Sequence, residues 1–243
     1  MLKKGFCGFN DFINGTTGNS VDLLTRYLGY DFCDAVKALS GMQSATKPAT
    51  VQTGKETGQI ALPEAAEPPF RRVFAYLTSS RCIPAVTVQR LIEAELLYQD
   101  VEHGNAVFVS RERDYCEIRG TLTYGPPFHG CRKAQPDNYW SFGRPRGKDL
   151  TAYICEAAID AVSLYEILKT RGPVNALFCS IGGVANQKTI DRIAERYSAV
   201  LAVDNDDAGA ICRSRNKKLP ALVPASKDWN QDWKGMSGNV YAR

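Results

Sequence analysis

An unbroken apolar run that ends in two closely spaced acids constrains this chain more than any other feature of its sequence. Residues 199–203 read Ala-Val-Leu-Ala-Val, and Asp204 and Asp206 follow them. An apolar run of this length, bounded by polar residues, is typical of a strand buried on both faces, as in a parallel sheet. Open α/β sheets bind ligands at the loops that leave the carboxyl ends of such strands. The two carboxylates are therefore predicted to lie at a ligand-binding edge.

Carboxylate oxygens at such an edge suit a hard cation. If the chain stays extended beyond the strand, Asp204 and Asp206 point to the same side, because i and i+2 side chains point together. Mg²⁺ is usually held by a few carboxylates plus substrate phosphates. Most Asp-x-Asp pairs are solvated turns, however, so a metal site needs support from elsewhere in the chain.

Two units of strand, polar turn and helix precede this edge. Residues 151–155 predict a buried strand with Glu156 at its carboxyl end, and a helical pattern follows. Residues 176–179 predict the next strand, after which come the Gly182-Gly183 turn and a helix whose apolar stripe runs over 190–197. Glu156 is either a site residue or a first-turn glutamate that complements the helix dipole.

The features that follow these strands are, in chain order, Glu156, the Gly182-Gly183 turn, Asp204-x-Asp206 and Gly209. Their order resembles the toprim domain, which is shared by bacterial-type primases, topoisomerases and some nucleases. The resemblance covers residues 149–234 and departs from the family pattern at Ala157, where toprim domains commonly have glycine. It implies an α/β fold with a Rossmann-like parallel sheet of about four strands flanked by helices. The fourth strand is expected over residues 220–223, after a helix over 207–218.

The resemblance also implies metal-dependent chemistry on nucleic acids. Asp204 and Asp206 would hold Mg²⁺ or Mn²⁺, and Glu156 would be a further ligand or a general acid/base. Two metal ions can stabilise the attacking and leaving oxygens of a phosphoryl transfer together. Asp228 and Asp232 would complete the acidic surface, with Asp228 as a fourth candidate ligand, or would belong to a solvated loop. The glycines at 182, 183 and 209 would form structural turns.

Basic and aromatic side chains alternate through the middle of the chain. The basic residues are Arg111, Arg113, Arg119, Arg132, Lys133, Arg144, Arg146 and Lys148, and the aromatic residues are Tyr115, Tyr124, Phe128, Tyr139, Trp140 and Phe142. This pattern suits a groove for single-stranded nucleic acid, in which phosphates meet cations and bases stack on rings. The alternative is a β-rich domain that buries the aromatics and exposes the arginines. The residues predicted to bind nucleic acid or nucleotide are Arg81, Arg119, Arg132, Lys133 and Arg213.

The chain is predicted to have four parts. These are a short helical segment over 1–41, a flexible linker over 42–69, a basic α+β domain over 70–148 and a toprim domain over 149–243. The linker is rich in Thr, Gln, Ala, Pro and Glu and lacks hydrophobic periodicity. The elements expected in the α+β domain are helices around 73–77 and 86–97 and strands near 106–109 and 116–119.

The α+β domain resembles the uncharacterised domain that precedes toprim in plasmid and transposon proteins. The residues that carry this resemblance are Phe74–Leu77, Arg81–Pro84, Ala106–Val109 and Arg119-Gly120. The domain is also similar to the basic subdomain before toprim in bacterial-type primases, although Cys82 stands where their pattern has glycine. Residues 15–22 and 35–39 resemble the tail of a primase zinc-binding domain. A structural zinc site needs four Cys or His ligands. Because this segment offers only Cys7 and Cys33, no zinc is predicted.

Length and composition fit a globular cytoplasmic protein. The chain of 243 residues is 44% hydrophobic and 23% charged, with a net charge of +4. It lacks the apolar run of ~20 residues that a membrane span requires, and its start lacks a signal-peptide pattern. Eight cysteines without a C-x-x-C pair indicate reduced thiols. His103 and His129 lack further ligands nearby and are expected at the surface or in loops.

Together these features predict a primase-like nucleotidyltransferase of a plasmid or transposon. It would use Mg²⁺ or Mn²⁺ to join nucleoside triphosphates into short primers on single-stranded DNA. A relaxase or helicase of the same mobile element is an expected partner. The alternatives are a metal-dependent nuclease, since toprim domains also support cleavage, and a non-catalytic module that loads a partner onto DNA.

Overall fold

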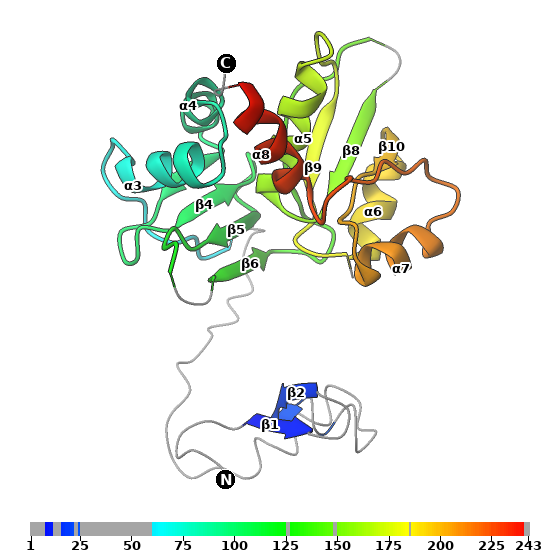
Figure 1. The fold of residues 1–243 in the computed structure, drawn as a ribbon, viewed down its shortest axis with the longest axis horizontal. Helices are drawn as coiled ribbons and strands as arrows, with labels where there is room; N and C mark the ends of the chain where they lie inside the picture. The colour runs from blue at the N-terminus through cyan, green and yellow to red at the C-terminus, as the bar shows by residue number, and fades with distance from the viewer. Residues whose placement is uncertain are drawn as a thin grey trace. The chain divides into compact units, whose positions relative to one another are not determined.

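The computed structural model describes residues 8–11, 16–21, 24, 60–124, 127–147, 150–184 and 186–240. The chain forms two compact units, Met1–Lys55 and Glu56–Arg243 (Figure 1). In the first unit, β1 (Gly8–Asp11) pairs antiparallel with β2 (Thr16–Asn19). A hairpin therefore occupies part of the segment predicted as helical, where β-branched Thr16 and Thr17 favour a strand. The helical pattern over 32–39 and both cysteines of this segment lie outside the described residues.

The second unit begins with an antiparallel sheet. Its strands lie in the order β3 (Leu97–Gln99), β4 (Ala106–Val109), β5 (Tyr115–Arg119) and β6 (His129–Lys133). The preceding helices are α3 (Arg71–Ala75), the π-helical turn η1 (Tyr76–Ser80) and α4 (Ala85–Glu93). Side chains of β4 alternate between two cores. Phe108 packs in the core that contains the helices, whereas Val107 packs with Ile60 and Leu62.

The described end of the predicted linker packs against this sheet. The backbone N–H of Ala66 donates to the Gln99 carbonyl (2.8 Å), and the N–H of Val101 donates to the Glu64 carbonyl (3.0 Å). The edge of β3 offers unpaired backbone groups, which explains why this segment does not run free. Residues 42–59 of the predicted linker lie outside the described residues, and the predicted boundaries between the four parts stay a prediction.

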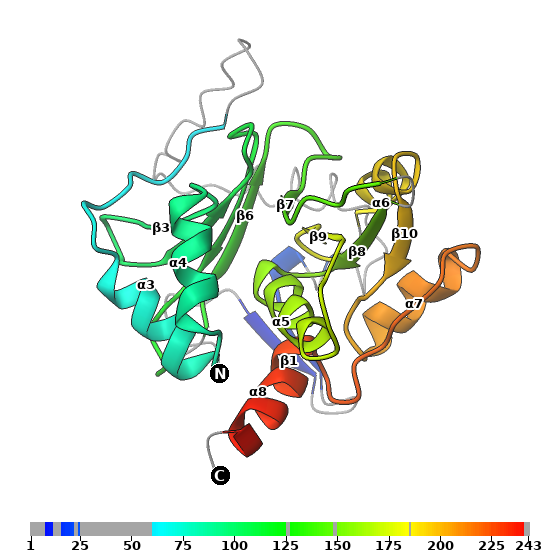
Figure 2. The same ribbon diagram turned by 90° about the horizontal axis from the view of Figure 1, so that it is seen from above.

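The second sheet of this unit is mostly parallel. Its strands lie in the order β10 (Ser198–Leu201), β8 (Thr151–Cys155), β9 (Leu177–Ser180) and β7 (Trp140–Phe142), of which only β7 runs antiparallel to its neighbour. The helices are α5 (Ala158–Lys169), α6 (Gln187–Ala194), α7 (Asp207–Arg215) and α8 (Trp229–Val240). Helices α5 and α8 cover one face, and α6 and α7 the other (Figure 2). This arrangement confirms the predicted α/β fold.

Two features of this sheet differ from the prediction. Residues 220–223 make only a single parallel bridge, between Ala221 and Leu201, and the fourth strand is β7 instead. Helix α8 was not predicted, although Trp229 and Trp233 stand four residues apart and are both buried. The charged and polar residues around these tryptophans obscured the apolar stripe. None of the helices in the described part of the chain is long and apolar enough to cross a membrane.

Candidate active site

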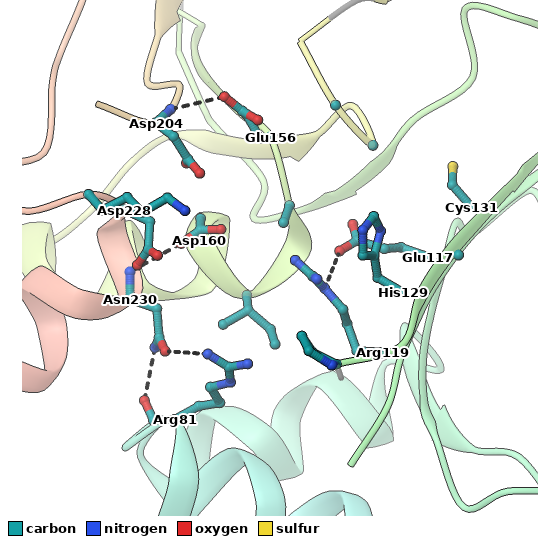
Figure 3. A pocket seen from close by; sticks show the side chains of 17 residues that line it. Arg81, Glu117, Arg119, His129, Cys131, Glu156, Asp160, Asp204, Asp228 and Asn230 are labelled. Carbon is teal, nitrogen blue, oxygen red and sulfur yellow. Dashed lines mark hydrogen bonds and ion pairs between the residues drawn. The ribbon is translucent and has the colours of Figure 1, made fainter. Parts of the chain in front are cut away.

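A cavity of about 470 Å³ lies where β8 and β9 end, between the two sheets of the second unit. Four acids from the parallel sheet and its helices line it: Glu156, Asp160, Asp204 and Asp228. Two arginines that come earlier in the sequence than the parallel sheet, Arg81 and Arg119, also line the cavity (Figure 3). The cavity thus combines carboxylates and guanidinium groups from two regions of the chain.

Glu156 and Asp204 meet because their strands are parallel neighbours. Glu156 follows β8 directly and Asp204 follows β10, so both lie at the carboxyl edge of the sheet. The backbone N–H of Asp204 donates to Glu156 Oε1 at 3.3 Å. Burial raises the pKa of Asp204 to about 7, and the nearby negative charges of Glu156, Asp228 and Asp206 add to the rise. Burial also raises the pKa of Glu156, against the lowering effect of the Asp204 N–H.

These two carboxylates fit a divalent cation. Asp204 Oδ1 is buried and has no hydrogen-bond donor, and a buried charge without a partner is costly. A cation would satisfy that oxygen and offset the repulsion between the acids. Among the residues that the structure describes, no three His, Cys, Asp or Glu side chains converge to hold a metal by themselves. Mg²⁺ typically takes few protein ligands and keeps waters or substrate phosphates, so the geometry suits that ion.

Asp206 does not line this cavity. Its exposed side chain caps α7, where Oδ1 accepts the N–H of Gly209 at 2.9 Å. Since β10 ends at Leu201, the alternation of the strand no longer governs the acids that follow, and Asp204 and Asp206 do not point together into the cavity. The role of Asp206 as a metal ligand stays a prediction.

Asp228 and Asp232, the two acids that follow the bridge between Ala221 and Leu201, have different positions. Asp228 lines the cavity and also caps α8, because its Oδ1 accepts the N–H of Gln231 at 2.7 Å. Asp232 instead accepts the backbone N–H groups of Ala225 and Ser226, each at 2.7 Å. Asp228 therefore stays a candidate ligand, whereas Asp232 closes a loop away from the cavity.

The predicted turn glycines have steric reasons to be glycine. A Cβ atom at Gly209 would lie 2.0 Å from the Asp204 carbonyl oxygen, so the close approach of α7 to Asp204 requires glycine. Gly182 has a φ of +65°, and a Cβ there would lie 2.8 Å from Tyr115 Oη. Gly183 has a φ of +108°. These glycines set the backbone around the acids.

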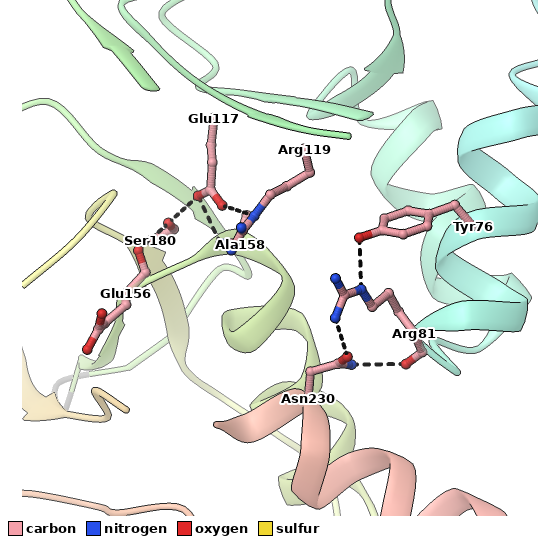
Figure 4. Close-up of polar contacts among 8 residues, drawn as sticks. All are labelled: Tyr76, Arg81, Glu117, Arg119, Glu156, Ala158, Ser180 and Asn230. Carbon is pink, nitrogen blue, oxygen red and sulfur yellow. Dashed lines mark hydrogen bonds and ion pairs between the residues drawn. The ribbon is translucent and has the colours of Figure 1, made fainter. Parts of the chain in front are cut away.

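Glu117 is a buried acid that the sequence analysis missed. The residue is 4% exposed. Its Oε2 accepts the N–H of Ala158 (2.9 Å) and the hydroxyl of Ser180 (2.7 Å), and its Oε1 pairs with Arg119 Nε at 3.3 Å (Figure 4). Glu117 thereby supplies the cap that Ala157 cannot give to the N-terminus of α5. A lone acid inside an apolar strand was the signal that could have identified it.

Strand register explains what else faces the cavity from the antiparallel sheet. Glu117 lies opposite Cys131 and Arg119 lies opposite His129, so all four belong to one face of the β5–β6 pair. All four line the cavity. His129, expected at the surface or in a loop, is thus an exposed strand residue at the site.

Arg81 is held in place at the cavity. Its Nε donates to Tyr76 Oη at 2.8 Å, and its guanidinium carbon lies 5.2 Å from the centroid of the same ring. Its Nη1 donates to Asn230 Oδ1 at 3.4 Å, and Asn230 Nδ2 donates back to the Arg81 carbonyl at 2.9 Å. The backbone N–H of Asn230 donates to Asp160, a buried acid whose pKa burial raises to about 8.

The other three residues predicted to bind nucleic acid or nucleotide contact backbone carbonyl groups. Lys133 Nζ donates to the Ile181 carbonyl (2.9 Å), and Arg213 Nη1 donates to the Asp204 carbonyl (2.8 Å). Arg132 Nη1 donates to the Ala61 carbonyl, because alternation along β6 turns Arg132 away from the face of Cys131. Lys133 and Arg213 thus support the glycine turn and the Asp204 backbone, and none of the three lines the cavity.

Four of the six aromatics in the basic and aromatic pattern belong to the hydrophobic cores, with Tyr139 as a partly buried member. Tyr115, Trp140 and Phe142 are buried, and the Trp140 ring lies 5.4 Å from that of Phe108 and 5.3 Å from that of Phe142. Their burial contradicts stacking of these three rings on bases and agrees with the alternative, a domain that buries its aromatics. Tyr124 and Phe128 are exposed.

Comparison with known proteins agrees with the sequence resemblances. Residues 153–233 match the family model described as Toprim-like, and residues 75–145 match the one described as Protein of unknown function (DUF3991). These matches confirm the toprim resemblance and the resemblance of the preceding domain, and they support a toprim-type, DNA-related function. No curated protein matches the chain.

Two solved structures show limited similarity to this chain. The primase fragment of the bacteriophage T7 primase-helicase protein is 18% identical, with 68% of this chain and 72% of that chain covered and a TM-score of 0.48. The Aquifex aeolicus primase, in its zinc-binding and RNA polymerase domains, is 14% identical, with 98% and 72% covered and a TM-score of 0.41.

Proposed function

We propose that this chain, which joins a DUF3991-type domain to a toprim-like domain, is a metal-dependent nucleotidyltransferase that makes short primers on single-stranded DNA. One observation carries the proposal: carboxylates and guanidinium groups line the same cavity. Nucleotidyl transfer adds negative charge to a phosphate that is already anionic. The reaction therefore needs positively charged groups beside the reacting phosphate and beside the phosphates that flank it.

The acids would hold the cation. Asp204 offers the buried oxygen that lacks a donor, Glu156 lies beside it, and Asp228 lines the same cavity. When bound, Mg²⁺ or Mn²⁺ would stabilise the charge that develops on the attacking and leaving oxygens. The raised pKa of Glu156 also suits a group that accepts the proton of the primer hydroxyl.

The arginines would bind the triphosphate of the incoming nucleotide. Glu117 engages only the Nε of Arg119, and both Nη groups of Arg119 have no partner within the described part of the chain. Tyr76 and Asn230 engage the Nε and Nη1 of Arg81, which fixes the direction of its guanidinium group. Guanidinium groups in fixed orientations bind phosphate oxygens in pairs. The mobile-element context and a relaxase or helicase partner belong to the same proposal through the resemblance of the preceding domain.

Incorporation of radiolabelled nucleotides on single-stranded DNA with Mg²⁺ or Mn²⁺ tests this proposal. We expect short new products from the wild type, their loss in Asp204→Asn, and a raised nucleotide requirement in Arg119→Gln. The matched control is Glu195→Gln, which removes one exposed charge at the end of α6. Template shortening that Asp204→Asn abolishes would replace the proposal with a nuclease. Retained DNA binding without either product would replace it with an accessory module.

A further inference from the structure

Several arginines of the basic middle segment have no place in the acidic cavity. Arg111 lies in the turn between β4 and β5, and Arg144 follows β7. Together with Arg90, near the end of α4, they line a second cavity of about 280 Å³. The three side chains come from three separate elements and converge only in the folded chain.

This second cavity lies at the opposite end of the parallel sheet from the acids. Ala176, which precedes β9, and Gly143, which follows the antiparallel β7, both line it. Gly182 and Gly183, which follow β9, line the acidic cavity. A ligand in the second cavity would therefore be separated from the acidic cavity by the length of β9.

The charge of the three arginines is not offset. In the part of the chain that the structure describes, none of the three guanidinium groups makes an ion pair or a hydrogen bond, and no acidic side chain lines the second cavity. Arg113, only two residues from Arg111, is by contrast paired with Glu95 at 3.0 Å. Positive charge gathered around a cavity without a partner favours an anion.

The other walls of the cavity are apolar and aromatic. Leu91, Leu96, Phe142 and Tyr165 contribute to them. Tyr165 is partly exposed and packs edge-to-face on Phe142, with ring centroids 5.4 Å apart. Lys169 Nζ lies 5.5 Å from the centroid of the Tyr165 ring and pairs with Glu166 Oε2 at 3.2 Å, so its charge is already offset and, among the described residues around this cavity, only the three arginines supply free positive charge. The cavity thus combines three exposed arginine side chains with apolar and aromatic walls.

We propose that this second cavity binds the phosphate of a nucleotide unit through Arg90, Arg111 and Arg144, with the base against Tyr165. Guanidinium groups bind phosphate oxygens through paired N–H donors, and bases stack on aromatic rings. The unit comes either from a single-stranded DNA chain or from a free nucleotide. Such a site is separate from the proposed nucleotidyl transfer and requires neither the cation nor Asp204.

Binding of a fluorescein-labelled oligothymidylate, measured by anisotropy in EDTA over a range of salt concentrations, tests the site. The test variant is the triple change Arg90→Gln/Arg111→Gln/Arg144→Gln. Its matched control is Arg71→Gln/Arg196→Gln/Arg215→Gln, which removes the same charge from exposed positions outside both cavities. Thermal melting checks that each variant is folded.

We expect the test variant to bind at least about tenfold more weakly than the control. The slope of log K against log salt should fall by about 0.7, because the three arginines hold one phosphate and each phosphate contact on a single strand contributes about 0.7. Equal affinity and slope in the two triple variants would overturn the proposal. Displacement of the oligonucleotide from the control variant by a free nucleoside triphosphate would assign the site to a nucleotide, and failure to displace it would assign the site to a strand. Because EDTA removes the cation, this binding is measured independently of the proposed nucleotidyl transfer.

Discussion

Glu117 offers the sharpest test of how the two domains build the site, because one buried carboxylate makes three contacts. It accepts from Ala158 N–H and the Ser180 hydroxyl and pairs with Arg119. Glu117→Gln keeps the size of the side chain and removes its charge. We expect this change to lower the free energy of unfolding by about 2 kcal/mol, since hydrogen bonds to charged groups contribute about 1.5–3 kcal/mol and neutral ones about 1 kcal/mol.

The contacts of Glu117 set this magnitude. Ala158 is the first residue of α5, and a negative charge at a helix N-terminus stabilises by about 0.3–1 kcal/mol, or up to ~2 kcal/mol when partly buried. The ion pair adds less, because the Arg119 side chain is 24% exposed and solvent screens it. Glu117→Leu removes both carboxylate oxygens, leaves the buried N–H of Ala158 without this acceptor and breaks the ion pair with Arg119, so the loss should rise to about 3–5 kcal/mol.

Thermal and urea unfolding measure these losses directly. For a unit of this size, about 2 kcal/mol lowers the melting temperature by about 4–8 °C. Glu112→Gln is the control, since Glu112 is an exposed acid in the turn between β4 and β5. If Glu117→Gln melts within about 1 °C of that control, the cap on α5 does not stabilise the fold and the reasoning is refuted.

Three further outcomes follow from the site. Gly209→Ala should lower the free energy of unfolding in urea by about 1–3 kcal/mol, because its Cβ atom would meet the Asp204 carbonyl oxygen. Gly235→Ala is the control, since a Cβ atom at this position in α8 has nothing within 4 Å, and it should raise the same free energy by about 0.5–1 kcal/mol. Equal effects of the two changes would contradict the close approach of α7 to Asp204. Burial raises the pKa of Asp160 from 3.8 to about 8, so between these values the folded state binds the extra proton and stability should fall as pH rises, by up to about 1.4 kcal/mol per pH unit. Unfolding measured in EDTA should show a smaller fall of stability with pH in Asp160→Asn than in the wild type. Parallel pH profiles of the two proteins would refute the raised pKa of Asp160. Mg²⁺ should raise the melting temperature of the wild type, by the equivalent of about 2.7 kcal/mol at a hundredfold excess over its Kd, but not that of Asp204→Asn; an equal rise in both would exclude Asp204 as a ligand.

Local sequence patterns were sufficient for the parallel sheet. The apolar runs over 151–155, 176–179 and 199–203 match β8, β9 and β10 within two residues, because each buried strand carries its own signal. Parallel pairing then forces the ends of β8 and β10 to one edge, which brings Glu156 and Asp204 together. This part of the site was predictable without any knowledge of contacts between distant segments.

Elements that depend on distant partners were not predictable in the same way. Strand β6 reads His-Gly-Cys-Arg-Lys and lacks an apolar alternation, so it forms because β5 offers an edge. Strand β7 is three residues long and joins the parallel sheet from before the toprim-like region. Residues 220–223 carry the stronger local strand signal but make one bridge. Tertiary pairing overrode local preference at each of these places.

A single spacing rule explains why the sequence analysis missed Glu117 and why it placed Asp206 at the cavity. Side chains at i and i+2 share a face only while the backbone stays in a paired strand. Glu117 and Arg119 satisfy this condition, since both are paired with β4 and β6, and they line one cavity together. Asp204 and Asp206 lie beyond the end of β10, where the chain turns into α7, and they separate. The acidic motif therefore supplies one cavity acid instead of two, and the strand of the preceding domain supplies the groups that face it. The toprim-like region holds Glu156, Asp160, Asp204 and Asp228, and β5 places Glu117 and Arg119 at the same cavity.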